Sequence, residues 1–116
     1  MNDLKDGKGN LTYKNGDNYY GEFKDDKRNG KGKLKYTNGD YYVGEFKDDK
    51  KEGSGTYFYK DGDYYEGDFK DDNRHSKGRV YNPSENKERC KGKFKNGDYQ
   101  TTFWDFKIFN SQPHCY

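Results

Sequence analysis

Apolar and polar residues alternate along most of this chain, in short runs that are separated by turns. In the stretch 32–46, the sequence GKLKYTNGDYYVGEF places two such runs on either side of Asn38-Gly39. Alternation with a period of two is typical of a strand with one buried face, and an Asn-Gly between two runs indicates a β-hairpin. The same signal returns as Lys-Asn-Gly at 14–16 and Lys-Asp-Gly at 60–62. The pattern therefore predicts a series of hairpins.

A block of 23 residues underlies this series. Gly-Glu-Phe at 21–23 and 44–46 returns as Gly-Asp-Phe at 67–69, and Lys-Asp-Asp follows each time. A fixed period of this length indicates a repeat protein, whose units bury their apolar faces only against their neighbours. The expected units within residues 1–104 are about 7–23, 24–46, 47–69 and 70–94, with a closing hairpin at 90–104.

The length of the turn loop decides which side chains share a face of the sheet. A two-residue loop, 38–39, would put Tyr42 on the face of Lys33. A three-residue loop, 37–39, with its glycine left-handed, pairs Leu34 with Tyr42 and gathers the apolar side chains together. We prefer the longer loop, because one buried face selects strongly against a slip in register. The resulting aromatic face contains Tyr13, Tyr19, Phe23, Leu34, Tyr36, Tyr42, Phe46, Tyr57, Tyr59, Tyr65 and Phe69.

Composition sharpens this picture. The 116 residues suffice for one domain, and only 27% are hydrophobic while 38% are charged, which is a balance typical of disorder. The 19% of aromatic residues recur in register and argue for a folded array instead. The net charge is +2 with no basic stripe along the repeats, so we expect no nucleic-acid partner. No phosphate-binding loop occurs, and we expect neither a cofactor nor a small-molecule substrate.

Pairs of aspartates in the repeat are the first candidates for chemistry. They lie at 25–26, 48–49 and 71–72. A calcium-binding EF-hand needs alternating oxygen ligands and a closing glutamate, and catalytic carboxylates need a pocket that separates their pKa values. The repeats offer neither feature, so we interpret these pairs as solvated turn residues and expect no enzymatic activity.

Cysteine and histidine are scarce and lie toward the C-terminus. Cys90 and Cys115 are too few for a disulfide-stapled scaffold, so we expect reduced thiols. Together with His75 and His114 they lack the spacing of a zinc site, which could form only if the C-terminal tail folded back. Neither an apolar signal segment nor an apolar run long enough to cross a bilayer occurs, so we expect a soluble protein of the cytoplasm.

The linked positions of the repeat resemble a known family. Tyr-x-Gly-[Glu/Asp]-Phe, then Gly-x-Gly after six residues, then Asn/Asp-Gly-Asp before the next Tyr-x-Gly, is similar to the MORN repeat. The similarity is close over 7–81 and loose over 82–104. It implies an all-β fold, an elongated, twisted single-layer antiparallel sheet with one hairpin per repeat. It also implies scaffolding in cytoskeletal or ciliary assemblies, as in radial spoke heads, or membrane contact, as in junctophilins.

The function we expect is a non-catalytic scaffold that binds a protein partner, or a second copy of the chain, along the aromatic face, through the apolar C-terminal segment, or through both. Large aromatic stripes on a single sheet rarely stay bare. The alternative is a peripheral membrane module that binds phosphoinositides, although each of its cations follows two aspartates that weaken the attraction to an anionic headgroup. The residues of this alternative are Lys27, Arg28, Lys50, Lys51 and Arg74.

The repeat breaks down near the C-terminus. Tyr81 to Lys87 replace the tight turn, and the next Gly-x-Phe arrives at 92–94, 25 residues after its predecessor. This spacing predicts a two-residue insertion in a hairpin loop that contains Pro83. Residues 105–116 are expected to cap the array or to dock a partner. The apolar residues of this docking tail are Phe103, Trp104, Phe106, Ile108 and Phe109.

Overall fold

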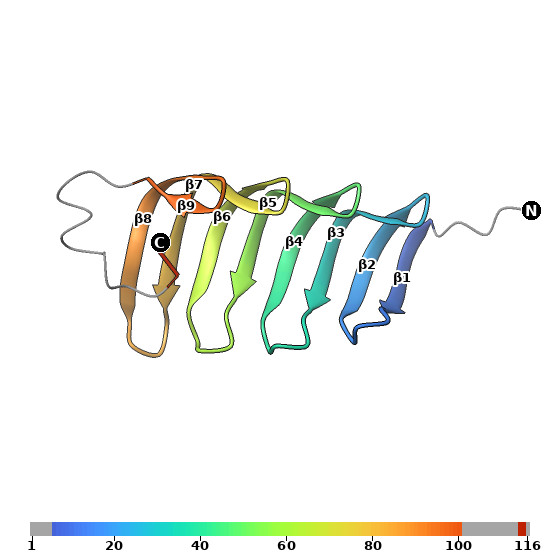
Figure 1. Ribbon diagram of the computed structural model, residues 1–116, viewed down its shortest axis with the longest axis horizontal. Coiled ribbons are helices and arrows are strands. Elements are labelled where there is room, and N and C mark those ends of the chain that lie inside the picture. The colour runs from blue at the N-terminus through green and yellow to red at the C-terminus, as the bar shows by residue number, and fades with distance from the viewer. Residues whose placement is uncertain (1–5, 101–113, 116) are drawn as a thin grey trace, which may run out of the picture.

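Nine antiparallel strands form a single open sheet in sequence order (Figure 1). The computed structural model describes residues 6–100 and 114–115, and no helix occurs in that part of the chain. The strands are β1 (Gly7–Thr12), β2 (Asn18–Lys24), β3 (Lys27–Lys35), β4 (Tyr41–Lys47), β5 (Lys50–Phe58), β6 (Tyr64–Lys70), β7 (Asn73–Asn82), β8 (Lys87–Lys95) and β9 (Asp98–Tyr99). The predicted all-β, single-layer sheet of hairpins is confirmed.

The hairpin turns have the three-residue loop that the pattern favoured. Leu34 pairs with Tyr42 across β3 and β4. The loop closes where the backbone N–H of Tyr36 donates to the carbonyl of Asp40 at 2.9 Å. Gly39 has a φ of 100°, a conformation that a side chain would strain, which explains the glycine at this point of the first three hairpin turns, at 16, 39 and 62.

Tight turns at the aspartate pairs join one hairpin to the next, at the opposite ends of the strands from the hairpin loops. In the first pair, Asp25 and Asp26 have φ angles of 51° and 68°. Two successive residues with positive φ form the type I′ turn that matches the twist of a hairpin, and aspartate tolerates this conformation better than most residues. The prediction that the pairs are turn residues is therefore confirmed.

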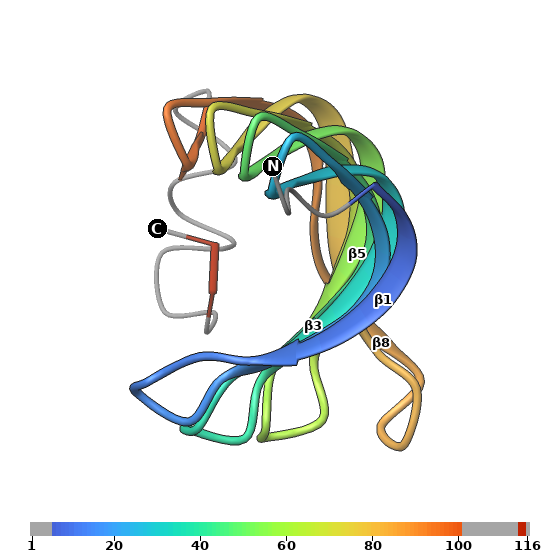
Figure 2. The same cartoon turned by 90° about the vertical axis from the view of Figure 1, so that its right-hand side faces the viewer.

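The sheet curls into a trough (Figure 2). Each full repeat contains a β-bulge just after its central glycine, between 21 and 23, 44 and 46, and 67 and 69. Bulges bend a strand and increase its twist, so their recurrence curls the whole sheet in one direction. The two C-terminal residues that the structure describes, 114–115, lie inside this trough.

The core is a row of interlocked aromatic rings on the concave side of the sheet. Tyr19 is fully buried, and its ring meets Phe23 and Phe46 edge-to-face at centroid distances of 5.0 and 5.2 Å. Its hydroxyl donates to the carbonyl of Glu22 at 2.7 Å. The ring lies directly on Gly32, where an added Cβ would come within 2.2 Å of the tyrosine oxygen. Glycine is therefore required wherever a tyrosine crosses the neighbouring strand.

The insertion near the C-terminus is divided between two places. One extra residue lengthens the loop to 83–86, and the other is Arg89, which is bulged out of the pairing between β7 and β8. The predicted two-residue insertion in the loop is therefore half right. The bulge buries Arg89 next to its neighbour Cys90, whereas regular alternation would have placed them on opposite faces.

At the C-terminal end of the sheet, an aromatic ring from β9 replaces the ring that the repeat would have supplied. Cys90 occupies the register position of Tyr65 in the preceding repeat, so no ring from β8 covers Gly92. Tyr99 of β9 covers it instead, pairing with Phe94 and placing its ring 3.1 Å from the Cβ that Gly92 would carry. This is the start of the predicted closing hairpin.

Candidate functional site

The predicted aromatic face divides into buried and accessible side chains. Seven of its eleven members are almost fully buried against one another: Tyr19, Phe23, Leu34, Tyr42, Phe46, Tyr65 and Phe69. The other four, Tyr13, Tyr36, Tyr57 and Tyr59, are half-buried along the trough. Partner binding by this face stays a prediction, and a partner in the trough would meet mainly these four tyrosines.

Cations stand beside these tyrosines at intervals of one repeat. The guanidinium of Arg28 lies 5.4 Å from the ring centroid of Tyr13. One repeat further, the Nζ of Lys51 donates to the hydroxyl of Tyr36 at 3.1 Å. A cation this close to an aromatic ring is attracted by the ring's electrons. We call each such pair a tyrosine–cation unit; the third consists of Tyr59 and Arg74, with 3.5 Å from Nη1 to the hydroxyl.

The aspartate turns hold these cations in place. The carboxylate of Asp49 accepts from the backbone N–H of Arg28 at 2.8 Å and from its Nε at 3.3 Å. Asp72 accepts from the backbone N–H of Lys51 at 2.8 Å. In the third unit, a backbone carbonyl takes the place of the aspartate, and the carbonyl of Gly97 accepts from Nε of Arg74 at 3.0 Å. The aspartates thus connect successive repeats, a role that the sequence interpretation missed because the partner is 21 residues away.

Three of the five predicted lipid-binding cations are the ones that these contacts hold in the trough. Arg28, Lys51 and Arg74 lie in the trough with partners inside the chain. Lys27 and Lys50 are exposed, and Nζ of Lys50 lies 4.0 Å from a carboxylate oxygen of Asp71. The structure therefore does not gather these five side chains into one exposed basic patch.

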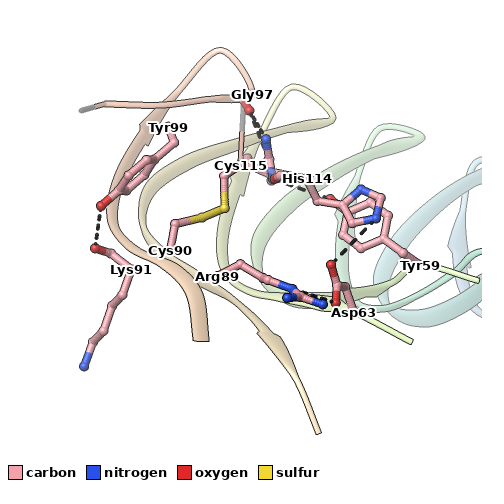
Figure 3. Close-up of a disulfide and its surroundings, with 10 residues drawn as sticks. Tyr59, Asp63, Arg89, Cys90, Lys91, Gly97, Tyr99, His114 and Cys115 are labelled. Carbon is pink, nitrogen blue, oxygen red and sulfur yellow. Dashed lines mark hydrogen bonds and ion pairs between the residues drawn. A yellow bond between two sulfur atoms is a disulfide. The ribbon is translucent and has the colours of Figure 1, made fainter. Parts of the chain in front are cut away.

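The C-terminal residues occupy the third tyrosine–cation unit (Figure 3). His114 stacks on Tyr59 with a centroid distance of 3.6 Å and an interplanar angle of 9°, and its carbonyl accepts a hydrogen bond from Nη1 of Arg74. Cys115 is joined by a disulfide to Cys90, with a Cα–Cα distance of 6.2 Å. The prediction of reduced thiols is wrong, because Cys115 lies against the sheet and is bonded to a cysteine 25 residues away in the sequence.

His114 also contacts the turn of the third repeat. Its Nε2 lies 2.7 Å from Oδ2 of Asp61. Burial raises the pKa of Asp61, but hydrogen bonds from His114 and from the backbone N–H of Asp63 outweigh this and hold the pKa below its usual value. The carboxyl is therefore ionised at neutral pH. The tail thus meets a negatively charged site that spacing along the chain did not indicate.

The tyrosines of the trough stay neutral at physiological pH. Burial raises the pKa of Tyr19 to about 12. Burial and the hydrogen bond to Asp40 also raise the pKa of Tyr57, whose hydroxyl lies 2.9 Å from a carboxylate oxygen. Both hydroxyls already donate inside the chain, to the carbonyl of Glu22 and to Asp40, so the donors that remain for a partner in the trough are chiefly the cations.

The opposite face of the sheet carries a shallow groove of about 780 Å³ above the central glycines. Its lining mixes Lys31 and Lys33 with Glu22 and Glu45, and it has no single sign of charge. Tyr20 beside it is 57% exposed. This face has its own row of rings, because Tyr41 stacks on Phe58 at a centroid distance of 4.4 Å and Tyr64 and Tyr81 continue the row. The trough differs from it in holding the C-terminal residues 114–115.

One set of predictions remains outside this description. The docking-tail residues Phe103, Trp104, Phe106, Ile108 and Phe109 lie outside the described residues. Within the described part of the chain, no helix has the length and apolar character needed to cross a membrane.

Comparison with known proteins identifies the repeat. Residues 1–18, 19–41, 42–64 and 65–86 each match the MORN repeat. A comparison with curated proteins found no match. Repeats of this kind generally mediate protein or membrane binding, and the family is not known to be catalytic. Because the four matches cover most of the sequence and the sheet is built from the corresponding hairpins, the chain belongs to the MORN repeat family.

Proposed function

We propose that this protein is a non-catalytic scaffold that binds an extended peptide segment of a protein partner in its trough. The observation that supports this most directly is the position of the chain's own C-terminal residues. His114 stacks on Tyr59 while its carbonyl accepts from Arg74, so one tyrosine–cation unit holds one residue through a planar side chain and a backbone oxygen. Residues 114–115 are thus an internal example of peptide residues bound in the trough.

The same unit is available twice more along the trough. Tyr36 with Lys51, and Tyr13 with Arg28, repeat the arrangement that holds the tail, and both tyrosines are half-buried. A partner segment with histidine or aromatic side chains could stack on these rings and offer its carbonyls to the cations. We therefore propose that a partner segment binds in the trough over the first two tyrosine–cation units, next to the third unit that His114 occupies.

Membrane binding stays the alternative function. Lys27 and Lys50 are exposed on one edge of the sheet, where an anionic surface could reach them. Carboxylates accompany them, as between Lys50 and Asp71, and these reduce the attraction to anionic lipid. We favour the protein partner for this reason.

A location in the cytoplasm, within a cytoskeletal or ciliary assembly, stays a prediction. The disulfide between Cys90 and Cys115 weighs against the cytoplasm, because disulfides persist mainly in oxidising compartments. Fractionation of cells that express the protein, with its thiols blocked before lysis, would test both the location and the redox state.

The peptide-binding proposal can be tested by display of a random peptide library against the full chain. We expect enrichment of peptides that contain histidine or aromatic residues. The double variant Tyr13→Ser/Tyr36→Ser should bind them at least about tenfold more weakly, because each lost ring contact is worth about 1 kcal/mol. Tyr20→Ser is the matched control, since Tyr20 is an exposed tyrosine on the opposite face, and it should bind as the wild type does.

Two results would contradict the proposal. One is equal peptide binding by the double variant and the wild type, which would place the site elsewhere. The other is saturable binding to phosphoinositide vesicles, absent with neutral vesicles and lost in Lys27→Glu/Lys50→Glu, together with no enrichment of peptides. That second result would establish the membrane alternative.

A further inference from the structure

Two carboxylates and an imidazole converge where the tail meets the third hairpin turn. Oδ2 of Asp61, a carboxylate oxygen of Asp63 and a ring nitrogen of His114 all lie within 4.8 Å of one another. Nε2 of His114 is 2.7 Å from Asp61 and 3.9 Å from Oδ2 of Asp63. Figure 3 shows the imidazole placed above Asp63 at the wall of the trough.

Asp63 is the unusual member of this cluster. It is only 1% exposed, and its Oδ2 has no hydrogen-bond partner within the part of the chain that the structure describes. Its other oxygen, Oδ1, accepts from Asn82 at 2.8 Å and from Nε of Arg89 at 3.3 Å. A buried carboxylate oxygen without a donor is costly, and such groups in folded proteins usually have a protein, water or ion partner.

The corresponding aspartate of the preceding repeat is fully satisfied. Oδ1 of Asp40 accepts from the backbone N–H of Lys60 at 2.9 Å. Its Oδ2 accepts from the hydroxyl of Tyr57 at 2.9 Å and from the side-chain amide of Asn38 at 3.4 Å. Three donors thus surround this carboxylate.

Each of those three donors is missing one repeat later. Asp61 stands where the repeat has Asn38, so a second carboxylate oxygen replaces an amide N–H. Pro83 stands at the position of Lys60 and has no backbone N–H, and Val80 stands at the position of Tyr57 and has no hydroxyl. The changes leave two carboxylate oxygens beside each other, and a cation next to them would offset their mutual repulsion.

We propose that Asp61, Asp63 and His114 bind a divalent transition-metal ion of the Zn²⁺ class. Carboxylate oxygens and an imidazole nitrogen are common zinc ligands, whereas Ca²⁺ and Mg²⁺ prefer sites made only of oxygen. Arg89 does not oppose a second cation here, because Nη2 pairs with Glu85 at 3.0 Å. The carboxylates of Asp61, Asp63 and Glu85 and the guanidinium of Arg89 together carry two net negative charges. A divalent ion would neutralise them.

The ion would attach the tail to the array at a second point. Cys115 is already bonded to Cys90, and His114 is its immediate neighbour in the chain. Asp61 is about half-exposed, with 49% of its side chain accessible, so an ion can reach the cluster from solvent. The metal and the disulfide together would fix the tail over the third tyrosine–cation unit.

Isothermal titration of the oxidised full-length protein with Zn²⁺ alone tests the proposal. We expect one equivalent of zinc per chain, and an affinity at least about tenfold lower in both Asp61→Asn and His114→Ala. The second histidine of the chain provides the matched control, because His75→Ala removes an imidazole that is not in the cluster. This control should bind zinc as the wild type does.

The opposite results would overturn the proposal. These are no saturable zinc binding by the wild type at about 100 µM, or equal affinities in His114→Ala and His75→Ala. The side chains of His114 and Asp61 are 27% and 49% exposed and neither belongs to the aromatic core, so both variants should keep the sheet, which circular dichroism would verify. An equal affinity for Mg²⁺ would also overturn the assignment to a transition metal.

Discussion

The hairpin turns at 36–40 and 59–63 share one backbone and differ in what surrounds their aspartates. Both close with an N–H to carbonyl bond of 2.9 Å between the first and last residue. Asp40 is surrounded by donors from its own turn and from the next repeat, whereas Asp63 has one oxygen without any. The comparison shows that a repeat fixes its own backbone but depends on the following repeat to satisfy its buried polar groups. A change in the following repeat can therefore create a new site.

The same dependence extends to the aromatic core. In the regular repeats, a tyrosine covers both the central glycine of its own strand and the glycine paired with it on the next strand, as Tyr42 covers Gly44 and Gly55. At the C-terminal end Cys90 takes the place of that tyrosine, and the ring of Tyr99 comes from the closing strand. The cysteine thus removes one ring and provides the attachment for the tail.

The largest effect is expected where a tyrosine lies on a glycine inside the array. In Gly55→Ala, the new Cβ would lie 2.2 Å from the hydroxyl oxygen of Tyr42, so the buried ring must leave its place. The loss of one buried aromatic side chain costs about 3–5 kcal/mol. Urea denaturation should show this decrease in the free energy of unfolding.

The matched control is Gly9→Ala, at the same register position in the first strand. Its Cβ would approach only the ring of Phe23, at 3.3 Å, and no tyrosine ring covers it. We expect a change below about 1 kcal/mol. Equal effects of the two substitutions would show that the glycine is not needed to seat the ring.

The second effect concerns the disulfide, which distinguishes the C-terminal end from the regular repeats. Cys90→Ser/Cys115→Ser opens a loop of 25 residues and should lower the free energy of unfolding by about 3 kcal/mol. Wild-type protein under a reducing agent should show the same midpoint in urea as the double variant. If the reducing agent leaves the wild-type midpoint unchanged, the cysteines are not paired in solution.

The smallest effect is expected from exchanging the residue in which the two turns differ, which is Asn38 in one and Asp61 in the other. Asn38→Asp would place a carboxylate oxygen against Asp40 and should destabilise the protein by about 1 kcal/mol. The reciprocal change, Asp61→Asn in a His114→Ala background, should stabilise it by about 1 kcal/mol, because an amide would then face Oδ2 of Asp63. Thermal unfolding in the presence of a chelator measures both changes. Shifts of the same sign would contradict the comparison.

The regular array was predictable because each signal for it is local. The Asn-Gly turn, the alternation around it and the recurring glycines indicate the loop length, the register and the shared face within a single block of sequence. The pairing of Leu34 with Tyr42 follows from these signals, and the structure confirms it. The site at the third turn was not predictable in the same way, since His114 lies 53 residues from Asp61.

The sequence by itself determined the class of fold, because a strict period leaves one way to bury the tyrosines on the glycines of the next strand. It also marked residues after 76 as the place where the repeat fails. Only the tertiary structure decided what that failure produces: the bulge that buries Arg89, the disulfide to Cys115 and the unsatisfied oxygen of Asp63. The disulfide depends on where residue 115 meets the sheet, and the unsatisfied oxygen depends on side chains that the following repeat contributes. Contacts between residues so far apart are not encoded in the local pattern of one block.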